Sequence, residues 1–211
     1  MVGGRETPLP LRRIGGHEVG RILGRGATAS VYECRHVEHR RPVAVKVLHP
    51  HLARDPIATQ RFTREACALS RLVHPNVVQV LDVGDDNGVP FFVMSLVEGN
   101  DLTDHIRLFH PMTTAQIADC ILPVIDAVTA AHDAGIVHRD LKPSNIRLAR
   151  GPFGTLVPKV LDFGISKLTG GDEATDLTES GTAVGTVGYM SPEQLRSSRQ
   201  VDARSDIYAL G

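Results

Sequence analysis

The sequence predicts an α+β fold, and three observations support this class. Segments with the alternation and β-branching of strands gather before residue 98, at 17–32, 43–47, 76–81 and 90–97. One helical pattern, at 55–72, lies among them. A longer helical pattern, at 114–134, follows the strands. Strands and helices are thus segregated along the chain, as α+β proteins require.

Composition indicates a soluble globular protein. Of 211 residues, 42% are hydrophobic and 22% charged, and the net charge of −1 predicts neither nucleic acid nor membrane-surface binding. The three cysteines are far apart and lack metal-ligand spacing, which suggests reduced thiols. No apolar run is long enough to span a bilayer, and the N-terminus lacks the apolar core of a signal peptide. We therefore expect no membrane segment and a cytoplasmic location.

The first strands surround a glycine-containing turn. Residues 1–16 are rich in Gly, Pro and Arg and are expected to form a flexible lead-in. The strand from His17 then enters a turn with Gly24 and Gly26, and a strand pattern resumes at Val31. Glycines let the backbone approach phosphates closely, and free N–H groups there bind oxygens. A strand-turn-strand hairpin also differs from the strand-to-helix turn of a dinucleotide fold.

The next strand and helix each carry one informative charge. The strand 43–47 places Ala44 and Lys46 on the same face, because side chains alternate along a strand. The helix 55–72 begins at an Asp-Pro pair, which is a capping signal. Glu65 lies at helical spacing from the apolar Phe62 and Leu69, so it faces inward with them. An inward Glu is costly unless a cation pairs with it. The alternative is that Glu65 faces the solvent, as most charged residues of a helix do.

Two further elements lead to the centre of the chain. The strands 76–81 and 90–97 flank an Asp-Asp-Asn-Gly turn at 85–88. A capping box at 113–116 begins a helix that ends at Gly135. The apolar face of this helix is expected to comprise Ile117, Ile121, Val124, Ile125, Val128 and Ala131.

The segment 138–145, His-Arg-Asp-Leu-Lys-Pro-Ser-Asn, combines three chemical groups in one loop. Asp140 is a potential base, Lys142 a cation, and Asn145 an amide that can bind a metal ion. Phosphoryl transfer requires these groups: a carboxylate for the attacking hydroxyl's proton, a cation near the moving phosphoryl group, and oxygen ligands for Mg²⁺. A second candidate ligand, Asp162, ends an apolar strand in the sequence Asp-Phe-Gly.

These motifs resemble those of the eukaryotic-type (Hanks-type) serine/threonine protein kinases, including their bacterial members. Segment 138–145 resembles the catalytic loop, 24–31 the glycine-rich loop with Ala29 in place of the third glycine, and 162–164 the metal-binding tripeptide. The similarity extends from about residue 19 to residue 211. It implies a two-lobed fold, with an N-lobe and hinge at 17–97 and a C-lobe at 98–211. The C-lobe is expected to be partial, because the family continues beyond the start of its central helix.

The resemblance also implies a role for each matching residue. Asp140 would be the base and Lys142 would steady the γ-phosphoryl group, while an ion pair of Lys46 with Glu65 would hold the α- and β-phosphates of ATP. Asn145 and Asp162 would bind Mg²⁺, with Mn²⁺ as an alternative. Met94 would lie behind the adenine, the backbone of Ser95 and Val97 at its edge, and Asp101 at the ribose. The full set of nucleotide contacts would be Gly24, Gly26, Val31, Ala44, Lys46, Met94, Ser95, Val97 and Asp101.

Regulatory and substrate segments follow from the same resemblance. Residues 165–185 would form an activation segment with several Ser and Thr hydroxyls, and Arg139 would receive a phosphate placed there. Residues 185–193 would dock a protein substrate. Asp206 would anchor the catalytic loop. Arg147 departs from the family, which has an apolar floor for adenine at this position.

The expected function is ATP-dependent phosphorylation of Ser or Thr hydroxyls in protein substrates. Autophosphorylation of the activation segment, with self-association of the chain, would accompany it. The alternative is an inactive truncated fragment or a nucleotide-binding scaffold module, which Arg147 and the partial C-lobe favour.

Overall fold

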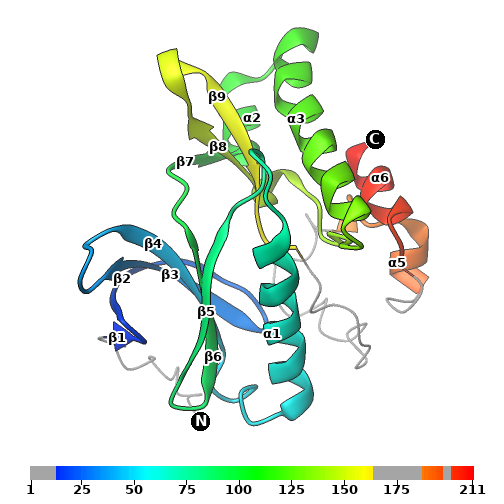
Figure 1. Cartoon of the computed structure of the whole chain (residues 1–211). Coiled ribbons are helices and arrows are strands. Elements are labelled where there is room, and N and C mark those ends of the chain that lie inside the picture. Colours follow the sequence, from blue (N-terminus) through cyan, green and yellow to red (C-terminus); the bar gives the residue numbers. More distant parts are fainter. Residues whose placement is uncertain (1–12, 164–186, 197–200) are drawn as a thin grey trace, which may run out of the picture. The chain divides into compact units, whose positions relative to one another are not determined.

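The structure is a computed structural model that describes residues 13–163, 187–196 and 201–211. It consists of two compact units, each described here by itself (Figure 1). The described part of the first unit comprises residues 13–59 and 80–96. The second comprises residues 60–79 and the described residues from 97 onward.

The first unit is built on a six-stranded antiparallel sheet with the order β1-β2-β3-β4-β6-β5. The strands are β1 (Arg13–Ile14), β2 (His17–Arg25), β3 (Ala29–His36), β4 (Pro42–Leu48), β5 (Val80–Asp86) and β6 (Val89–Ser95). Tight turns join sequential neighbours. Asn87 and Gly88 between β5 and β6 have φ of 54° and 81°, which suits the primed turns of two-residue hairpins. The predicted strand-turn-strand hairpin around Gly24 and Gly26 is confirmed as β2 and β3.

One face of this sheet forms an apolar core. Its buried members are Ile14, Cys34, Val43, Val45, Val47, Phe91 and Val93. Alternation along β4 accounts for the three valines, as predicted. Burial raises the pKa of the Cys34 thiol to about 11, so this thiol packs as a small apolar group.

Phe91 requires glycine at two neighbouring positions. A Cβ built on Gly15 or on Gly84 would lie 2.6 Å from the Cζ atom of the Phe91 ring. The amide of Gly15 also donates to Asp86 Oδ2 at 3.1 Å, which ties the β1–β2 turn to the β5–β6 turn. The sheet is therefore curled around the Phe91 ring.

Helix α1 (Pro56–Arg71) begins as the sequence predicts. The Asp55 side chain accepts the Ile57 amide at 2.9 Å, an N-terminal cap. The helix buries Phe62, Glu65, Ala66 and Leu69, so the inward position of Glu65 is confirmed.

The strand predicted at 76–81 is corrected in its boundary, because β5 begins at Val80. Val77 instead forms an isolated parallel bridge with Val160 of the second unit, to which residues 76–79 belong.

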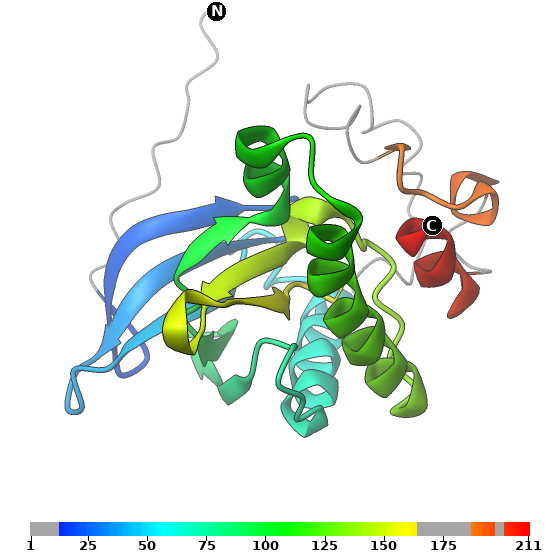
Figure 2. The ribbon, with the colours of Figure 1, turned by 90° about the horizontal axis from the view of Figure 1, so that it is seen from above.

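The second unit combines a small sheet with helices. The sheet has the order β7 (Gly99–Asp101), β8 (Ile146–Arg150) and β9 (Leu156–Val160). Its helices are α2 (Leu102–Phe109), α3 (Thr114–Asp133), α5 (Pro192–Arg196) and α6 (Arg204–Leu210), with single 3₁₀ turns at Pro143–Asn145 and Pro152–Gly154. Helix α3 packs against β9 and α6 (Figure 2).

Helix α3 shows the predicted capping box, in which Thr113 and Gln116 bond reciprocally, and it ends at Gly135 with φ of 74°. Its buried face is confirmed in part. Of the predicted residues, Val124, Val128 and Ala131 are buried, together with Cys120 and Ala127. Ile117 and Ile125, which we expected to face inward, are 48% and 41% exposed, and Ile121 is half-buried. The buried face therefore lies further toward the small residues Cys120 and Ala127 than the sequence predicted.

Helix α3 also corrects the expectation that no segment has the length and apolarity to span a bilayer. By length and composition it passes that test, with a mean hydropathy of 1.3 in its most apolar window. A single helix that passes this test is weak evidence of a membrane span, and α3 also packs against β9 and α6.

Candidate active site

Four predicted nucleotide contacts of the first unit lie side by side in the sheet. Val31 of β3 is the register partner of Lys46 of β4, and Ala44 of β4 is the partner of Met94 of β6. Paired residues of an antiparallel sheet share a face. Since Ala44 and Lys46 are two residues apart, all four lie on the face opposite the apolar core. The sheet therefore brings together Val31, Ala44, Lys46 and Met94 as the sequence predicts.

Lys46 has an aromatic neighbour on that face. Its Nζ atom lies 5.6 Å from the centroid of the Phe92 ring, its register partner on β6. This is a cation–π distance, and it holds the ammonium group close to the sheet. The pairing of Lys46 with Glu65 would join the two units and remains a prediction.

The glycine-containing turn is closed by backbone bonds. The Gly26 amide donates to the Ala29 carbonyl at 2.9 Å, and the Ser30 hydroxyl lies 3.1 Å from His49 Nε2. Neither Gly24 nor Gly26 has a positive φ, and a Cβ on Gly24 would meet no atom within 4 Å. Packing within the unit therefore does not require glycine at position 24; close approach of a phosphate remains the predicted reason.

In the second unit the catalytic loop gathers its three predicted groups around one carboxylate. Lys142 Nζ lies 3.1 Å from Asp140 Oδ2. Asn145 Nδ2 donates to the same oxygen at 3.1 Å and to the Asp140 carbonyl at 2.7 Å. A cation and an amide donor favour the ionised form of a carboxyl group. The loop thus brings the cation and the amide donor to the same oxygen of Asp140, as the sequence predicts.

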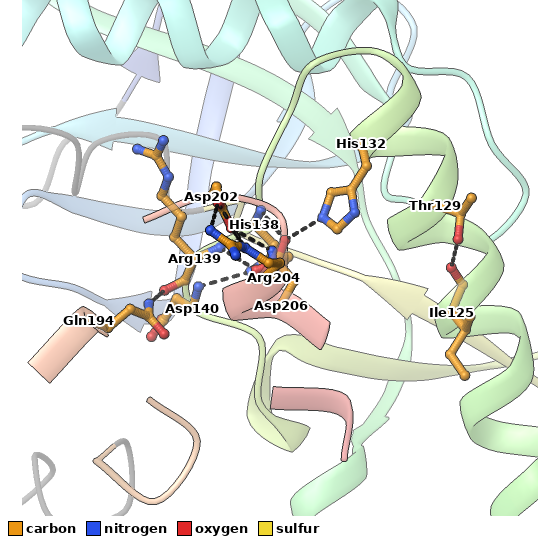
Figure 3. A network of polar contacts seen from close by, with 10 residues as sticks. All are labelled: Ile125, Thr129, His132, His138, Arg139, Asp140, Gln194, Asp202, Arg204 and Asp206. Atoms are coloured by element: carbon orange, nitrogen blue, oxygen red, sulfur yellow. Dashed lines mark hydrogen bonds and ion pairs between the residues drawn. The ribbon is translucent and has the colours of Figure 1, made fainter. Parts of the chain in front are cut away.

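Asp206 holds the backbone on the N-terminal side of that carboxylate (Figure 3). Its Oδ2 atom accepts the His138 amide and its Oδ1 atom accepts the Arg139 amide, both at 2.8 Å. Oδ2 also lies 2.8 Å from His132 Nε2 of α3. Asp206 is 1% exposed, so these bonds satisfy a carboxylate that burial would otherwise destabilise. The predicted anchoring of the loop by Asp206 agrees with this geometry.

His138 is buried in its neutral form. Its Nδ1 atom accepts the Asp140 amide at 3.2 Å, so the proton resides on Nε2, which donates to the Leu161 carbonyl at 2.8 Å. Its ring lies 4.7 Å from that of Phe163, between centroids. Burial is the main cause that lowers the pKa of His138, with nearby carboxylates opposing it. His138 thus links the loop to the segment that precedes Asp162.

Asn145 and Asp162, the two predicted metal ligands, lie on segments that a backbone hydrogen bond joins. The Leu161 amide donates to the Asn145 carbonyl at 2.8 Å, which brings the neighbouring Asp162 to the end of the loop. Asn145 turns its Nδ2 atom to Asp140, so its Oδ1 atom points away from that carboxylate. A carboxylate and an amide oxygen are ligands that Mg²⁺ accepts. Phe163 is fully buried, whereas Gly164 lies outside the described residues.

Arg139 adopts an unusual backbone conformation and buries part of its charge. Its φ of 64° lies in the left-handed region, which non-glycine residues rarely occupy. Its Nε and Nη1 atoms are buried and have no hydrogen-bond partner among the described residues. Burial lowers the pKa of this guanidinium, and Asp206 partly opposes the effect. A partly buried guanidinium of this kind agrees with the predicted role of Arg139 as the receptor of a phosphate, which remains a prediction.

The remaining predicted nucleotide contacts are placed less directly. Ser95 ends β6 in the first unit, and Val97 begins the longer of the two segments that make up the second. Asp101 caps α2, because its Oδ1 atom accepts the Asp104 amide at 3.0 Å. Arg147 is the register partner of Asp101 and donates from Nη1 to the Gly99 carbonyl at 2.9 Å. The guanidinium thus lies along β7.

Two further residues of the site escaped prediction. His132 binds Asp206, as described above. Gln194 of α5 donates from Nε2 to the Arg139 carbonyl at 2.8 Å. Neither residue belongs to a local motif, so the sequence alone could not predict the contact of His132 with Asp206 or that of Gln194 with Arg139. The predicted activation segment, 165–185, lies outside the described residues, as do the first two residues of the predicted substrate-docking segment 185–193.

A curled antiparallel sheet with Lys46 on one face, and a loop in which Asp140, Lys142 and Asn145 lie together beside the anchoring Asp206, are the features that the protein kinase fold and its catalytic loop predict. The family comparison agrees. The chain belongs to the protein kinase domain family, whose model matches residues 17–211. This membership implies ATP and a divalent metal ion.

Individual relatives are bacterial. The chain is 41% identical over 196 residues to serine/threonine-protein kinase PknH of Mycobacterium tuberculosis, covering 93% of this chain and 30% of the relative. It is 42% identical over 206 residues to serine/threonine-protein kinase Pkn1 of Myxococcus xanthus, covering 98% and 29%. The solved kinase domain of Mycobacterium tuberculosis PknI is similar at 30% identity with a TM-score of 0.68, covering 94% of this chain and 71% of that one. The chain thus spans about 30% of the length of the curated relatives it matches.

Proposed function

We propose that this chain transfers the γ-phosphoryl group of ATP to Ser or Thr hydroxyls of a protein substrate. The observation that carries the proposal is the arrangement at Asp140, whose carboxylate lies 3.1 Å from both Lys142 Nζ and Asn145 Nδ2. The printed names of the relatives, serine/threonine-protein kinases, support the same class of acceptor.

Each residue of the loop has a definite task in this proposal. Asp140 orients the acceptor hydroxyl and takes its proton as the bond to phosphorus forms. Lys142 reduces the negative charge of the transferring group, and Asn145 keeps Asp140 oriented through its two bonds. Asn145 and Asp162 would hold Mg²⁺, which neutralises charge on the phosphates when bound; Mn²⁺ would be accepted by the same oxygens.

Lys46 and the glycine-containing turn would bind the phosphates of ATP. Lys46 lies on the same face of the sheet as Val31, Ala44 and Met94, where an adenine ring would find an apolar surface. We propose that Glu65, buried on α1, pairs with Lys46. We also propose a cytoplasmic location for the chain.

Regulation by autophosphorylation is part of the proposal. The predicted activation segment contains Thr and Ser hydroxyls. The buried, partly unpartnered guanidinium of Arg139 supports a phosphate receptor near the catalytic loop. Self-association of two chains would supply the acceptor segment of one to the loop of the other.

Phosphoamino acid analysis tests the function. The purified chain is incubated with Mg²⁺, labelled ATP and a dephosphorylated protein mixture, with Asp162→Ala as the matched control. We expect phosphoserine or phosphothreonine with the wild type and none with the control. Phosphotyrosine alone, or equal labelling with Asp162→Ala, would contradict the proposal. ATP binding without transfer would instead support the nucleotide-binding scaffold.

A further inference from the structure

Gln194 connects two segments that are far apart in the sequence. Its Oε1 atom accepts the Ser191 amide at 3.0 Å, within the turn that begins α5. Its Nε2 atom donates to the Arg139 carbonyl of the catalytic loop at 2.8 Å. The two ends of the amide thus have opposite roles, which fixes the orientation of the side chain, since a flipped amide would oppose like groups at both ends.

The bond to Arg139 acts on the peptide group that joins Arg139 to Asp140. On its N-terminal side this stretch is held by Asp206, which accepts the amides of residues 138 and 139. Nothing in those two bonds determines how the following peptide group is rotated. His138 Nδ1 accepts the N–H of that group, the Asp140 amide, at 3.2 Å, and Gln194 Nε2 donates to its carbonyl at 2.8 Å, so the two side chains together determine its rotation.

The backbone conformation of Arg139 is the reason why the bond from Gln194 matters. Arg139 has φ of 64°, an unfavourable region that persists only where surrounding contacts enforce it. A left-handed residue directly before Asp140 sets the direction in which the aspartate side chain leaves the loop. If the carbonyl of Arg139 lost its partner, only the 3.2 Å bond to His138 Nδ1 would hold this peptide group, and relaxation of Arg139 would turn the Asp140 side chain away from Lys142.

We propose that Gln194 is a positioning residue, which orients the Asp140 carboxylate for proton transfer by holding the Arg139–Asp140 peptide group. Asp140, Lys142, Tyr189 and Gln194 line one hollow of the second unit. The position of α5 is thereby coupled to the orientation of the base. This inference rests on the proposed kinase function.

Two substitutions separate the two ends of the amide. Gln194→Met preserves the length of the side chain and removes both bonds. Gln194→Glu retains an acceptor for the Ser191 amide but places an oxygen against the Arg139 carbonyl. Leu195→Gln, at the next position of α5, is the control, because Leu195 is 56% exposed.

Steady-state kinetics give the first readout. We expect both Gln194 variants to lower kcat by about 10- to 100-fold, the order of effect that a displacement of roughly 1 Å has on a reacting group. The KM values for ATP and for the protein substrate should change little, because Gln194 is expected to contact neither. A kcat within twofold of wild type for Gln194→Glu, or a loss confined to KM, would overturn the inference.

Hydrogen exchange gives a readout that does not depend on activity. Peptides covering residues 136–143 should exchange faster in Gln194→Met than in wild type, whereas Leu195→Gln should leave them unchanged. Unchanged exchange in Gln194→Met would overturn the inference. If the wild-type chain transfers no phosphate, the proposed function fails, and the exchange result alone decides whether Gln194 holds the loop.

Discussion

The sheet of the first unit and the catalytic loop of the second differ in what holds them. The sheet is fixed by main-chain ladders and an apolar core around Val45 and Phe91, with backbone bonds that any sequence can make. The loop from His138 to Asn145 has little regular structure, and polar side chains such as Asp206 and Gln194 hold it. Apolar packing in the sheet is spread over many residues, whereas the conformation of the loop depends on a few polar side chains. Substitutions in the sheet should therefore reduce stability, and substitutions at the loop's anchors should reduce both stability and function.

Asp206→Ala is expected to have the largest effect, because it should lower the stability of the chain and also loosen the loop. It removes the acceptor for the His138 and Arg139 amides and the partner of His132. Breaking a buried charged network of this kind costs about 3–5 kcal/mol. Urea unfolding should show this loss, and hydrogen exchange of residues 136–143 should rise even where the chain remains folded. Loss of stability without faster exchange in the loop would contradict the comparison.

Phe91→Ala should be as destabilising without affecting the loop. Removing a buried phenyl ring from a packed core costs about 3–5 kcal/mol. The ring is 5% exposed and lies against Gly15 and Gly84, so little rearrangement can fill the space. Below the unfolding transition, exchange of residues 136–143 should equal that of wild type. If Phe91→Ala also loosened these residues, the two regions would not be independent.

Acid should destabilise both units through buried and partly buried histidines. Burial lowers the pKa of His138 in the second unit and of His17 and His49 in the first, relative to the unfolded chain. Between the folded and unfolded pKa values the unfolded chain binds more protons, so stability rises with pH there. The contribution is fully present above about pH 6.5, the unfolded pKa, and is lost as pH falls through the folded pKa.

Urea midpoints measured from pH 7.5 downward test this expectation. His138→Gln retains a donor for the Leu161 carbonyl but does not titrate. Its stability should fall less steeply below about pH 6.5, by up to roughly 1.4 kcal/mol per pH unit for the single group. A variant as acid-sensitive as wild type would show that His138 does not contribute.

Thr113→Ala should have the smallest effect, because it removes the capping box of α3. The loss of a helix N-cap costs about 0.5–2 kcal/mol. Thr113 lies far along the helix from His132, so exchange in the loop should not change. Thr113→Ser, which retains the acceptor oxygen, is the control and should recover most of the stability.

Local patterns in the sequence predicted most of the fold and the chemical groups of the site. The strands, the inward Glu65 and the grouping of Asp140 with Lys142 and Asn145 follow from residue type and spacing over a few positions. The buried face of α3 was predicted only in part, because the helix carries apolar residues on two sides and only its neighbours decide which side is covered: Val128 is buried as predicted, but Ile117 and Ile125 are not. Gln194 was missed for a related reason: it meets Arg139 at a separation of 55 residues, and only the folded chain shows that contact.

Intact-mass spectrometry of the chain after incubation with Mg²⁺ and ATP tests the central claim most directly. Wild type and Asp140→Asn are compared, since the asparagine retains the shape of the side chain and cannot accept the proton. The account predicts phosphoryl groups on wild type and none on Asp140→Asn, with both proteins folded. Equal incorporation in both proteins, or none in a soluble, folded wild type, would contradict it.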